Sequence, residues 1–336
     1  MDKINELKKY VIVTGGLGYI GSHTVVELNA AGFIPVIIDN LSNSSLKNLD
    51  GLIKITKENI NFHKIDCTNF NAVSNIFSNY KNIFSVIHFA AYKSVFESIN
   101  YPDKYYKNNI ESLNVILKVC EKFNINNLIF SSSCTVYGNP DILPVSENAL
   151  FKKPESPYGH TKQLCEEIIS KSKINSVNLR YFNPIGAHPS SSIGDLSHGN
   201  PTNLVPIITN AAKDKSSHLI INGNDYNTID GTCIRDYIHV VDLSIAHVSA
   251  LKFLLNNNGK YSFNVGLGRG YSVLEIIKFF IDITKIDLKY KFGPRRRGDV
   301  SSIYANTKLI SNYLNWKPRF SIKEAILDAW NWELNK

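Results

Sequence analysis

The sequence predicts an α/β protein, with a doubly wound parallel sheet formed by the first half of the chain and a smaller α+β lobe formed by the second. Short apolar runs alternate with amphipathic stretches at the spacing of βαβ units. The first run is β-branched and is followed by glycines, which is typical of a buried parallel strand. Beyond about residue 185, prolines and glycines interrupt this rhythm. The 336 residues suffice for two lobes that share an interface.

Strands and helices are expected to alternate through the first half. The run at 10–13 indicates a buried strand, and the helical pattern over 19–31 ends at Gly32. Further apolar runs predict strands at 33–38, 60–65, 84–90 and 127–130. Amphipathic stretches between them, at 69–79 and 102–123, predict crossover helices. Right-handed crossovers of this kind cover both faces of a parallel sheet.

The second half contains shorter elements. Apolar segments occur at 218–221 and 286–292, and helical patterns lie near 241–255, 272–283 and 306–314. We assign residues 1–185 to a first domain and residues 186–336 to a second domain. Some segments of the second half are expected to return to the first domain.

The charge and the cysteines restrict the class of protein. The formal net charge is +8, but basic residues are spread along the chain, and only 295–297 form a dense cluster. This favours a small anionic ligand over nucleic acid or a membrane surface. Five cysteines without C-x-x-C or Cys/His ligand spacing indicate reduced thiols and no metal site. Charges at the N-terminus, and the absence of a long apolar run, predict a cytoplasmic protein.

A glycine-rich turn follows the first expected strand and opens the first helix. Gly15, Gly18 and Gly21 form the pattern G-x-x-G-x-x-G. Glycine permits a sharp turn and a close approach to a pyrophosphate, and the helix N-terminus adds free N–H groups and a positive dipole end. In this context the pattern indicates a Rossmann dinucleotide site. A glycine-rich turn without a ligand is the alternative.

Acidic residues after the next two strands refine the expected cofactor. Asp39 lies 18 residues beyond Gly21. A carboxylate there accepts hydrogen bonds from the adenosine ribose and repels a 2′-phosphate, which favours NAD over NADP. The alternative is that Asp39 only caps the following helix. Asp66 is a candidate for a contact with the adenine ring, or else an ordinary helix N-cap.

A tyrosine and a lysine form the pattern Y-x-x-x-K. A helix that starts at Pro157 places Tyr158 and Lys162 on one face, one turn apart. A nearby ammonium and a positive nicotinamide ring both favour the phenolate, which would make Tyr158 a usable general base. Ser133 ends the preceding strand and is placed to hydrogen-bond the same substrate oxygen. Taken alone, the pattern is also compatible with an exposed helix face.

Taken together, these motifs resemble the extended branch of the short-chain dehydrogenase/reductase superfamily and, within it, the UDP-galactose (UDP-glucose) 4-epimerases. The resemblance extends over residues 10–335. The matching segments are TGGLGYIGSH at 14–23, DNL at 39–41, HFAA at 88–91, SSSCTVYG at 131–138, SPYGHTK at 156–162, RYFNPIGAHP at 180–189, GNDY at 223–226, RDYIHV at 235–240, PRRRGD at 294–299 and LNW at 314–316. Agreement over so many segments is more specific than any one motif.

The resemblance implies roles for individual residues. Tyr158 would remove the proton of the sugar 4-hydroxyl, Ser133 would hold that oxygen, and Lys162 would bind the nicotinamide ribose. The 4-keto sugar would then turn about its link to UDP and take the hydride back on its other face, with NAD bound throughout. Further positions that the resemblance places around NAD are Tyr19, Ile20, Asn40, Cys67, Phe89, Ala90, Lys93 and Asn108.

A second set of positions is implied for the UDP-sugar. It comprises Tyr181, Asn183, Asn203, Leu204, Asn222, Arg235, Arg296, Asp299 and Ile303. The two arginines also have a physical case, since the planar guanidinium matches a diphosphate through charge-assisted hydrogen bonds. A solvated basic turn is the alternative for Arg296, and a core position is the alternative for Tyr181.

Three positions depart from the family pattern. Asn222 stands where the family usually has an aromatic residue beside the uracil. Ile303 bounds the C2 side of the sugar, where some members have Tyr, and members with smaller residues tend to admit N-acetylated sugars. His160, inside Y-x-x-x-K, is expected to face solvent.

The resemblance predicts interconversion of UDP-glucose and UDP-galactose, with weaker activity on UDP-N-acetylhexosamines. It also predicts a homodimer that forms through the helices 102–123 and 158–172. Alternatives are another UDP-sugar 4-epimerase, a UDP-glucuronate decarboxylase or 4,6-dehydratase, and an inactive NAD-binding sensor. Dehydratases typically carry an acid pair after the catalytic Thr, which is absent after Thr135, and inactive sensors lose the Tyr or the Lys.

Overall fold

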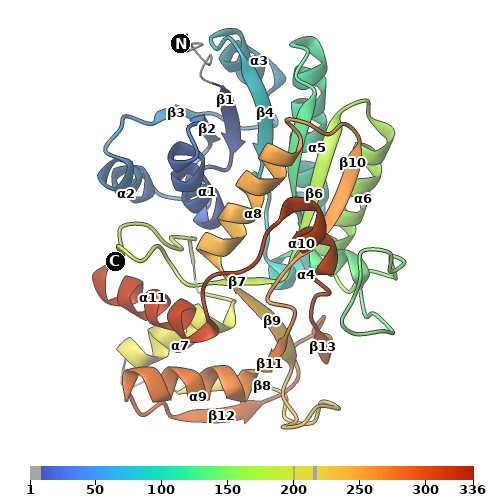
Figure 1. Cartoon of the computed structure of the whole chain (residues 1–336). Helices are drawn as coiled ribbons and strands as arrows, with labels where there is room; N and C mark the ends of the chain where they lie inside the picture. The colour runs from blue at the N-terminus through green and yellow to red at the C-terminus, as the bar shows by residue number, and fades with distance from the viewer. Residues whose placement is uncertain (1–8, 200, 215–217) are drawn as a thin grey trace.

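The computed structural model describes residues 9–199, 201–214 and 218–336. A seven-stranded sheet forms its centre, in the order β10-β6-β5-β4-β1-β2-β3, and every neighbouring pair is parallel (Figure 1). Its strands are β1 (Tyr10–Thr14), β2 (Ile34–Asp39), β3 (Asn61–Lys64), β4 (Ile83–His88), β5 (Asn127–Ser133), β6 (Asn175–Tyr181) and β10 (Lys260–Val265). This confirms the predicted α/β fold with a doubly wound parallel sheet.

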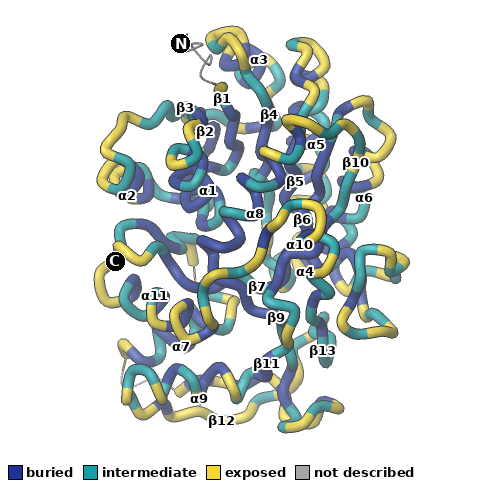
Figure 2. The backbone as a smooth tube through the Cα atoms, in the orientation of Figure 1, coloured by how far each residue is buried: buried dark blue, intermediate teal, exposed yellow. Residues whose placement is uncertain are grey.

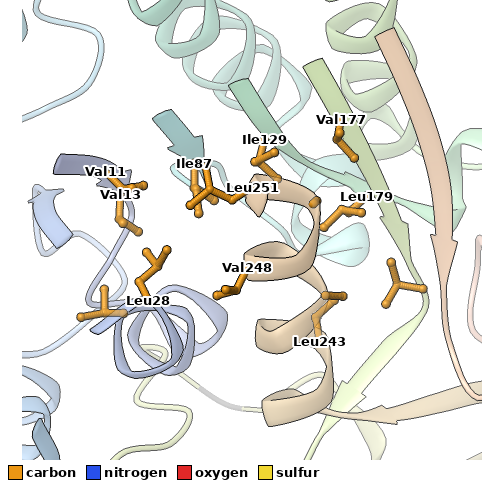
Figure 3. Packing of buried hydrophobic residues seen from close by; sticks show 14 of the residues in the cluster. Val11, Val13, Leu28, Ile87, Ile129, Val177, Leu179, Leu243, Val248 and Leu251 are labelled. Carbon is orange, nitrogen blue, oxygen red and sulfur yellow. The ribbon is translucent and has the colours of Figure 1, made fainter. Parts of the chain in front are cut away.

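Helices cover both faces of the sheet, because successive residues of each strand point to opposite sides. Val11 and Val13 pack with α1 (Tyr19–Ala30) and α8 (Val240–Phe253), as Figure 3 shows. Ile12, between them, packs on the other face with α3 (Phe70–Ser78), α5 (Pro102–Lys122) and α6 (Pro157–Lys171). The inner strands of the sheet are largely buried, whereas the edge strand β3 and many of the connecting loops are partly or fully exposed (Figure 2).

A smaller lobe lies beyond the carboxyl ends of the sheet (Figure 1). It contains β7 (Asn183–Ile185), β9 (Ile234–His239), β11 (Gly270–Ser272) and β13 (Ser302–Ile303) in one sheet, and the parallel pair β8 (Leu219–Asn222) and β12 (Tyr290–Gly293) in another. The helices α7 (Leu204–Lys213), α9 (Val273–Thr284) and α11 (Ile322–Asn335) share a separate core with β7, β8, β9 and β11. The remaining helices are α2 (Leu46–Thr56), α4 (Val95–Asn100), α10 (Lys308–Leu314) and the 3₁₀ helix η1 (Cys134–Tyr137).

Several segments of the second half of the chain pack with the first, among them the loop that carries Ile193, a residue of the main core. β10 pairs with β6 in the central sheet, and α8 packs against α1. The division of the chain at residue 185 stays a prediction, with these segments as its exceptions. Among the helices of the described residues, none combines the length and the apolar character that crossing a membrane requires.

Candidate active site

A cavity of about 860 Å³ opens at the carboxyl ends of the central strands and continues into the smaller lobe. Parallel sheets typically bind ligands at this edge. Gly15, Asp39, Phe89, Ser133 and Tyr181, which end or follow five of the strands, all line it. Every predicted site residue lines this cavity except Asn222, which is exposed at the end of β8.

The glycine turn fits a pyrophosphate. Gly15 has a φ of +69°, and a Cβ there would lie 2.9 Å from the Ala90 nitrogen. A Cβ on Gly21 would lie 2.3 Å from the carbonyl oxygen of Gly15. Gly18 is the N-cap of α1, and no side chain caps the helix, so its first N–H groups remain available to an anion. The turn therefore has the space and the donors that a dinucleotide requires.

The Asp39 carboxylate is buried at the edge of the same cavity. It accepts hydrogen bonds from the backbone nitrogens of Leu17 at 3.0 Å and Leu41 at 2.9 Å, and from the Ser44 hydroxyl at 2.8 Å. A carboxylate has about four acceptor positions, so capacity remains for a ribose hydroxyl. The N-cap of α2 is Ser45, so the alternative that Asp39 caps that helix is wrong.

Asp66 lies beside Asn40 at the adenine end expected from the sequence. It accepts hydrogen bonds from the Asn40 amide at 2.9 Å and from the backbone nitrogen of Thr68, also at 2.9 Å. Burial favours a higher pKa for this carboxyl, but the hydrogen bonds from Thr68 and Asn40 outweigh it, so the pKa lies below its ordinary value. Asn69 is the N-cap of α3, so the N-cap interpretation of Asp66 is wrong.

The predicted catalytic residues meet at the centre of the cavity. α6 begins at Pro157, and Ser156 caps it by accepting a hydrogen bond from the Gly159 nitrogen at 3.1 Å. Tyr158 and Lys162 are both buried, and the Lys162 Nζ lies 5.8 Å from the centroid of the Tyr158 ring. The alternative of an exposed helix face for Y-x-x-x-K is therefore wrong.

Polar contacts fix the lysine and the serine. The Lys162 ammonium donates a hydrogen bond to the carbonyl oxygen of Ser131 at 2.6 Å. The Ser133 hydroxyl accepts one from the Thr135 nitrogen at 3.2 Å and also interacts with the Tyr158 phenol. Ser133 and Tyr158 are therefore able to contact one substrate oxygen together.

Burial dominates the electrostatics of the pair. It raises the pKa of Tyr158, and the hydrogen bond with Ser133 opposes this only in part. Burial also lowers the pKa of Lys162 to about 8. The side chains of this chain thus do not by themselves lower the pKa of Tyr158, contrary to the contribution expected from the ammonium. A positive charge held against the phenol would lower the pKa of Tyr158, as a general base requires.

At the other end of the cavity, Asp299 orients two arginines. The Arg296 guanidinium donates to both of its carboxylate oxygens, at 2.9 Å and 3.1 Å, and to the carbonyl oxygen of Thr202 at 3.1 Å. Arg235 lies 3.5 Å from the same carboxylate. Two guanidinium groups on one wall provide positive charge and donors suited to a diphosphate.

The remaining residues predicted for the UDP-sugar, apart from Asn222, line the same cavity. Asn183 begins β7, and Asn203 is the N-cap of α7 but makes no side-chain capping hydrogen bond. Ile303 is 4% exposed and packs with Cys134 and Phe182. The Tyr181 hydroxyl hydrogen-bonds with Ser131, and Leu204 begins α7.

Some positions differ from the expectations or were missed. His160, expected to face solvent, is half-buried, and its Nδ1 hydrogen-bonds with the Tyr106 hydroxyl at 2.8 Å, so that expectation is wrong. Asp195 lines the cavity and lies 3.6 Å from Lys93, and Glu97 and Lys104 also line it. None of these three acidic or basic residues belongs to a motif, and only their tertiary placement identifies them.

Comparisons with known proteins agree with this arrangement. A family model described as GDP-mannose 4,6 dehydratase matches residues 12–329. The UDP-glucose 4-epimerase of Dictyostelium discoideum is 45% identical over 329 residues, which cover 96% of this chain and 95% of that protein.

Solved structures of similar proteins carry ligands. The UDP-glucose 4-epimerase from Stenotrophomonas maltophila, with bound NAD and formylated UDP-arabinopyranose, is 39% identical, has a TM-score of 0.94, and covers 97% of this chain and 98% of its own. The UDP-glucose 4-epimerase from Bifidobacterium longum, in complex with NAD+ and UDP, is 38% identical, also with a TM-score of 0.94. It covers 98% of this chain and 99% of its own.

Proposed function

The chain belongs to the family of UDP-glucose 4-epimerases, and from this membership we propose that it interconverts UDP-glucose and UDP-galactose with a tightly bound NAD. The observation that carries the proposal is one cavity that joins the glycine turn, the buried Tyr158–Lys162 pair and the arginines held by Asp299. A dinucleotide, a reacting carbon and a diphosphate each find suitable partners along its length.

Each of the site's side chains has its own role in the reaction. Bound NAD supplies a reversible hydride acceptor for C4 of the sugar. Tyr158 accepts the proton of the 4-hydroxyl as C4 is oxidised and returns a proton when C4 is reduced. Ser133 holds the same oxygen, and Lys162 would bind the nicotinamide ribose. Because burial outweighs the effect of the neighbouring side chains on the pKa of Tyr158, the phenolate also requires the positive charge of the bound cofactor. The arginines keep the diphosphate in place while the oxidised sugar turns to present its other face.

The alternative functions receive less support. A dehydratase needs carboxylates for elimination, and here Val136 and Tyr137 follow Thr135, both fully buried. A sensor that binds NAD without catalysis would not need Ser133, Tyr158 and Lys162 together. These three side chains converge on one cavity, which favours epimerisation.

We expect NAD to copurify with the protein and epimerisation to proceed without added cofactor. A hydride that must return to the same sugar requires a cofactor that does not leave between the two steps. The measurement is the formation of UDP-glucose from UDP-galactose without added NAD, together with the nicotinamide content of the denatured protein. Absence of any nicotinamide nucleotide, combined with strict dependence on added NAD, would contradict the proposal.

We also expect a homodimer formed through α5 and α6. These helices pack together, and Ile110, Leu117, Leu164 and Ile168 remain half-exposed on them. Light scattering should give the mass of a dimer, and Leu164→Glu should shift it toward a monomer because the charge cannot be buried in an apolar interface. The control Leu150→Glu, at a residue that is 87% exposed, should leave the mass unchanged. A wild-type protein that is monomeric at all working concentrations would rule out the homodimer.

Ile303 is expected to restrict N-acetylated sugars. It lines the cavity on β13, and an Ile side chain is stiff at χ1, so it yields space less readily than Leu or Met. Rejection by an apolar wall is partial, on the order of 1–3 kcal/mol. Ile303→Tyr should abolish activity on UDP-N-acetylhexosamines and largely spare the plain hexoses, and Ile303→Ala should raise the N-acetyl activity.

The ratio of kcat/KM between the two substrate pairs decides the role of Ile303. Because Ile303 is also buried in a small core cluster, Ile303→Ala could act only through stability. In that case both activities would fall together, and an unchanged ratio in the three proteins would refute the specificity role.

We further place the protein in the cytoplasm. All five cysteines are free and buried, which suits a compartment where thiols stay reduced. Fractionation of the native host's cells with antibodies to the protein would test this, and recovery with an extracytoplasmic fraction would refute it.

A further inference from the structure

Residues 186–199, which we call the strap, run along one wall of the cavity. In Figure 1 the strap is the yellow-green loop between α2 and α11. Its residues Asp195, Ser197, His198 and Gly199 line the same cavity as Asp39. The strap thus borders the nucleotide half of the site, although it belongs to none of the three sheets of the described residues.

Hydrogen bonds fix both ends of the strap to the first half of the chain. The Tyr19 hydroxyl, on the helix that follows the glycine turn, donates to the carbonyl oxygen of Gly186 at 2.7 Å. The backbone nitrogen of His198 donates to the side-chain oxygen of Asn43 at 2.9 Å. Asn43 and Tyr19 both line the cavity, so the strap spans the space between the turns after β1 and β2.

Close packing holds the middle of the strap. Ile193 is fully buried in the main core. A Cβ on Gly51 of α2 would lie 2.1 Å from the carbonyl oxygen of Ser192, and a Cβ on Gly194 would lie 2.4 Å from the Trp332 ring. The strap is therefore wedged between α2 and α11, and only small local movements are open to it without loss of these contacts.

One ion pair crosses from the strap to the loop after β4. The Lys93 Nζ lies 3.6 Å from the Asp195 carboxylate, with side-chain exposures of 41% and 20%. The same ammonium lies 5.8 Å from the centroid of the Tyr19 ring. Asp195 also accepts a hydrogen bond from the backbone nitrogen of Ser197 at 3.0 Å, which fixes its direction. Burial favours a higher pKa for Asp195, but Lys93 and Ser197 outweigh it, so the pKa lies below its usual value.

We propose that Asp195 is a positioning residue that holds the Lys93 ammonium against the dinucleotide site, and that this pair slows dissociation of the bound dinucleotide. The inference rests on the proposed function, since it takes NAD as the occupant. Without the carboxylate, the half-exposed Lys93 side chain is free to turn to solvent. The effect then falls on the rate of release rather than on the chemistry at Tyr158.

The test measures exchange of bound NAD in the purified holoenzyme against an excess of isotopically labelled NAD. Asp195→Asn keeps the shape and removes the charge, and it should exchange about fivefold to tenfold faster, since changes at such contacts act mainly on dissociation rates. Asp195→Glu keeps the charge and should restore slow exchange. The matched control is Asp141→Asn, which removes an exposed carboxylate paired with Lys152 outside the cavity and should exchange at the wild-type rate.

A double variant tests whether the two residues act through each other. Lys93→Met with Asp195→Asn should exchange no faster than Lys93→Met alone. Additive effects, a wild-type rate in Asp195→Asn, or failure of Asp195→Glu to restore slow exchange would each overturn the proposal. If the wild-type protein carries NAD but exchanges it as fast as Asp195→Asn does, only the proposed role of the Lys93–Asp195 pair is overturned. If the wild-type protein carries no NAD, the proposed function and the proposed role of the Lys93–Asp195 pair are both overturned.

Discussion

Tyr158→Phe is expected to lower turnover by a factor on the order of 10²–10⁴, as loss of a positioned general base should. The change removes one oxygen and keeps the buried ring, which packs edge-on against Tyr105 with 6.5 Å between the ring centroids. Lys162 retains its hydrogen bond to the carbonyl oxygen of Ser131, so folding and NAD binding should remain nearly intact. The measurements are steady-state turnover of UDP-galactose and the NAD content of the purified variant.

A matched control separates the chemical role from a general effect of losing a phenol. The Tyr80 hydroxyl hydrogen-bonds with His63 at 2.8 Å, and neither residue lines the cavity. Tyr80→Phe should therefore keep wild-type turnover. Wild-type turnover in Tyr158→Phe would rule out Tyr158 as the base, and loss of bound NAD in that variant would assign it a structural role instead.

Local patterns predicted β1 to β5 of the central sheet and most of the residues that line the cavity, but not the strands β6 and β10. The β-branched runs at the centre of the sheet are buried on both faces, so their hydrophobic signal is continuous and easy to recognise. The glycine turn follows β1 and Ser133 ends β5, and the sheet topology brings these strand ends to one edge, where Y-x-x-x-K at the start of α6 also lines the cavity. Residues as far apart as Gly15 and Tyr158 are therefore brought together by an order of elements that the sequence already contains.

The features that could not be predicted from the sequence depend on contacts between distant segments. Gly51 lies inside α2, although glycine disfavours helix, because the strap at Ser192 leaves no room for a Cβ. Asp195 acquires its partner Lys93 only through the path of the strap. The sign of the pKa shift at Tyr158 was missed because the spacing of Y-x-x-x-K carries no information on burial.

Asn222 marks the limit of the resemblance itself. The resemblance places Asn222 at the uracil site, but in the structure this residue is exposed at the end of β8 and does not line the cavity. A role for Asn222 at the base stays a prediction. A position without the expected aromatic side chain offers no stacking surface, so the structure gives no physical reason to expect a strong contact there.

A buried ion pair ties the catalytic helix to the sheet. Glu166 lies one turn beyond Lys162 on α6, and its carboxylate accepts hydrogen bonds from the Arg180 guanidinium at 2.6 Å and 2.9 Å. Their side chains are only 6% and 7% exposed. Arg180 also donates to the Tyr137 hydroxyl at 3.0 Å, which connects β6 with the segment that follows Ser133. The pair therefore positions α6 relative to the strand that carries Ser133.

Glu166→Met is expected to destabilise the protein by about 3–5 kcal/mol, because it leaves the Arg180 charge buried without its partner. Arg180→Met should destabilise the protein by a similar amount, because it leaves the Glu166 carboxylate buried without its partner. The double variant should lose much less than the sum of the two, since no charge then remains unpaired in the interior. The measurement is urea unfolding of each variant at one protein concentration and one NAD concentration, because bound ligand and subunit association both shift apparent stability.

The neighbouring glutamate provides the control. Glu167 pairs with Lys171 on the exposed face of the same helix, where water and salt screen an ion pair and it contributes little to stability. Glu167→Met should therefore leave the unfolding midpoint nearly unchanged, although it makes the same chemical change one residue away. If Glu166→Met and Glu167→Met cost the same, or if the two single losses add in the double variant, the Arg180–Glu166 pair does not hold the helix in the way proposed.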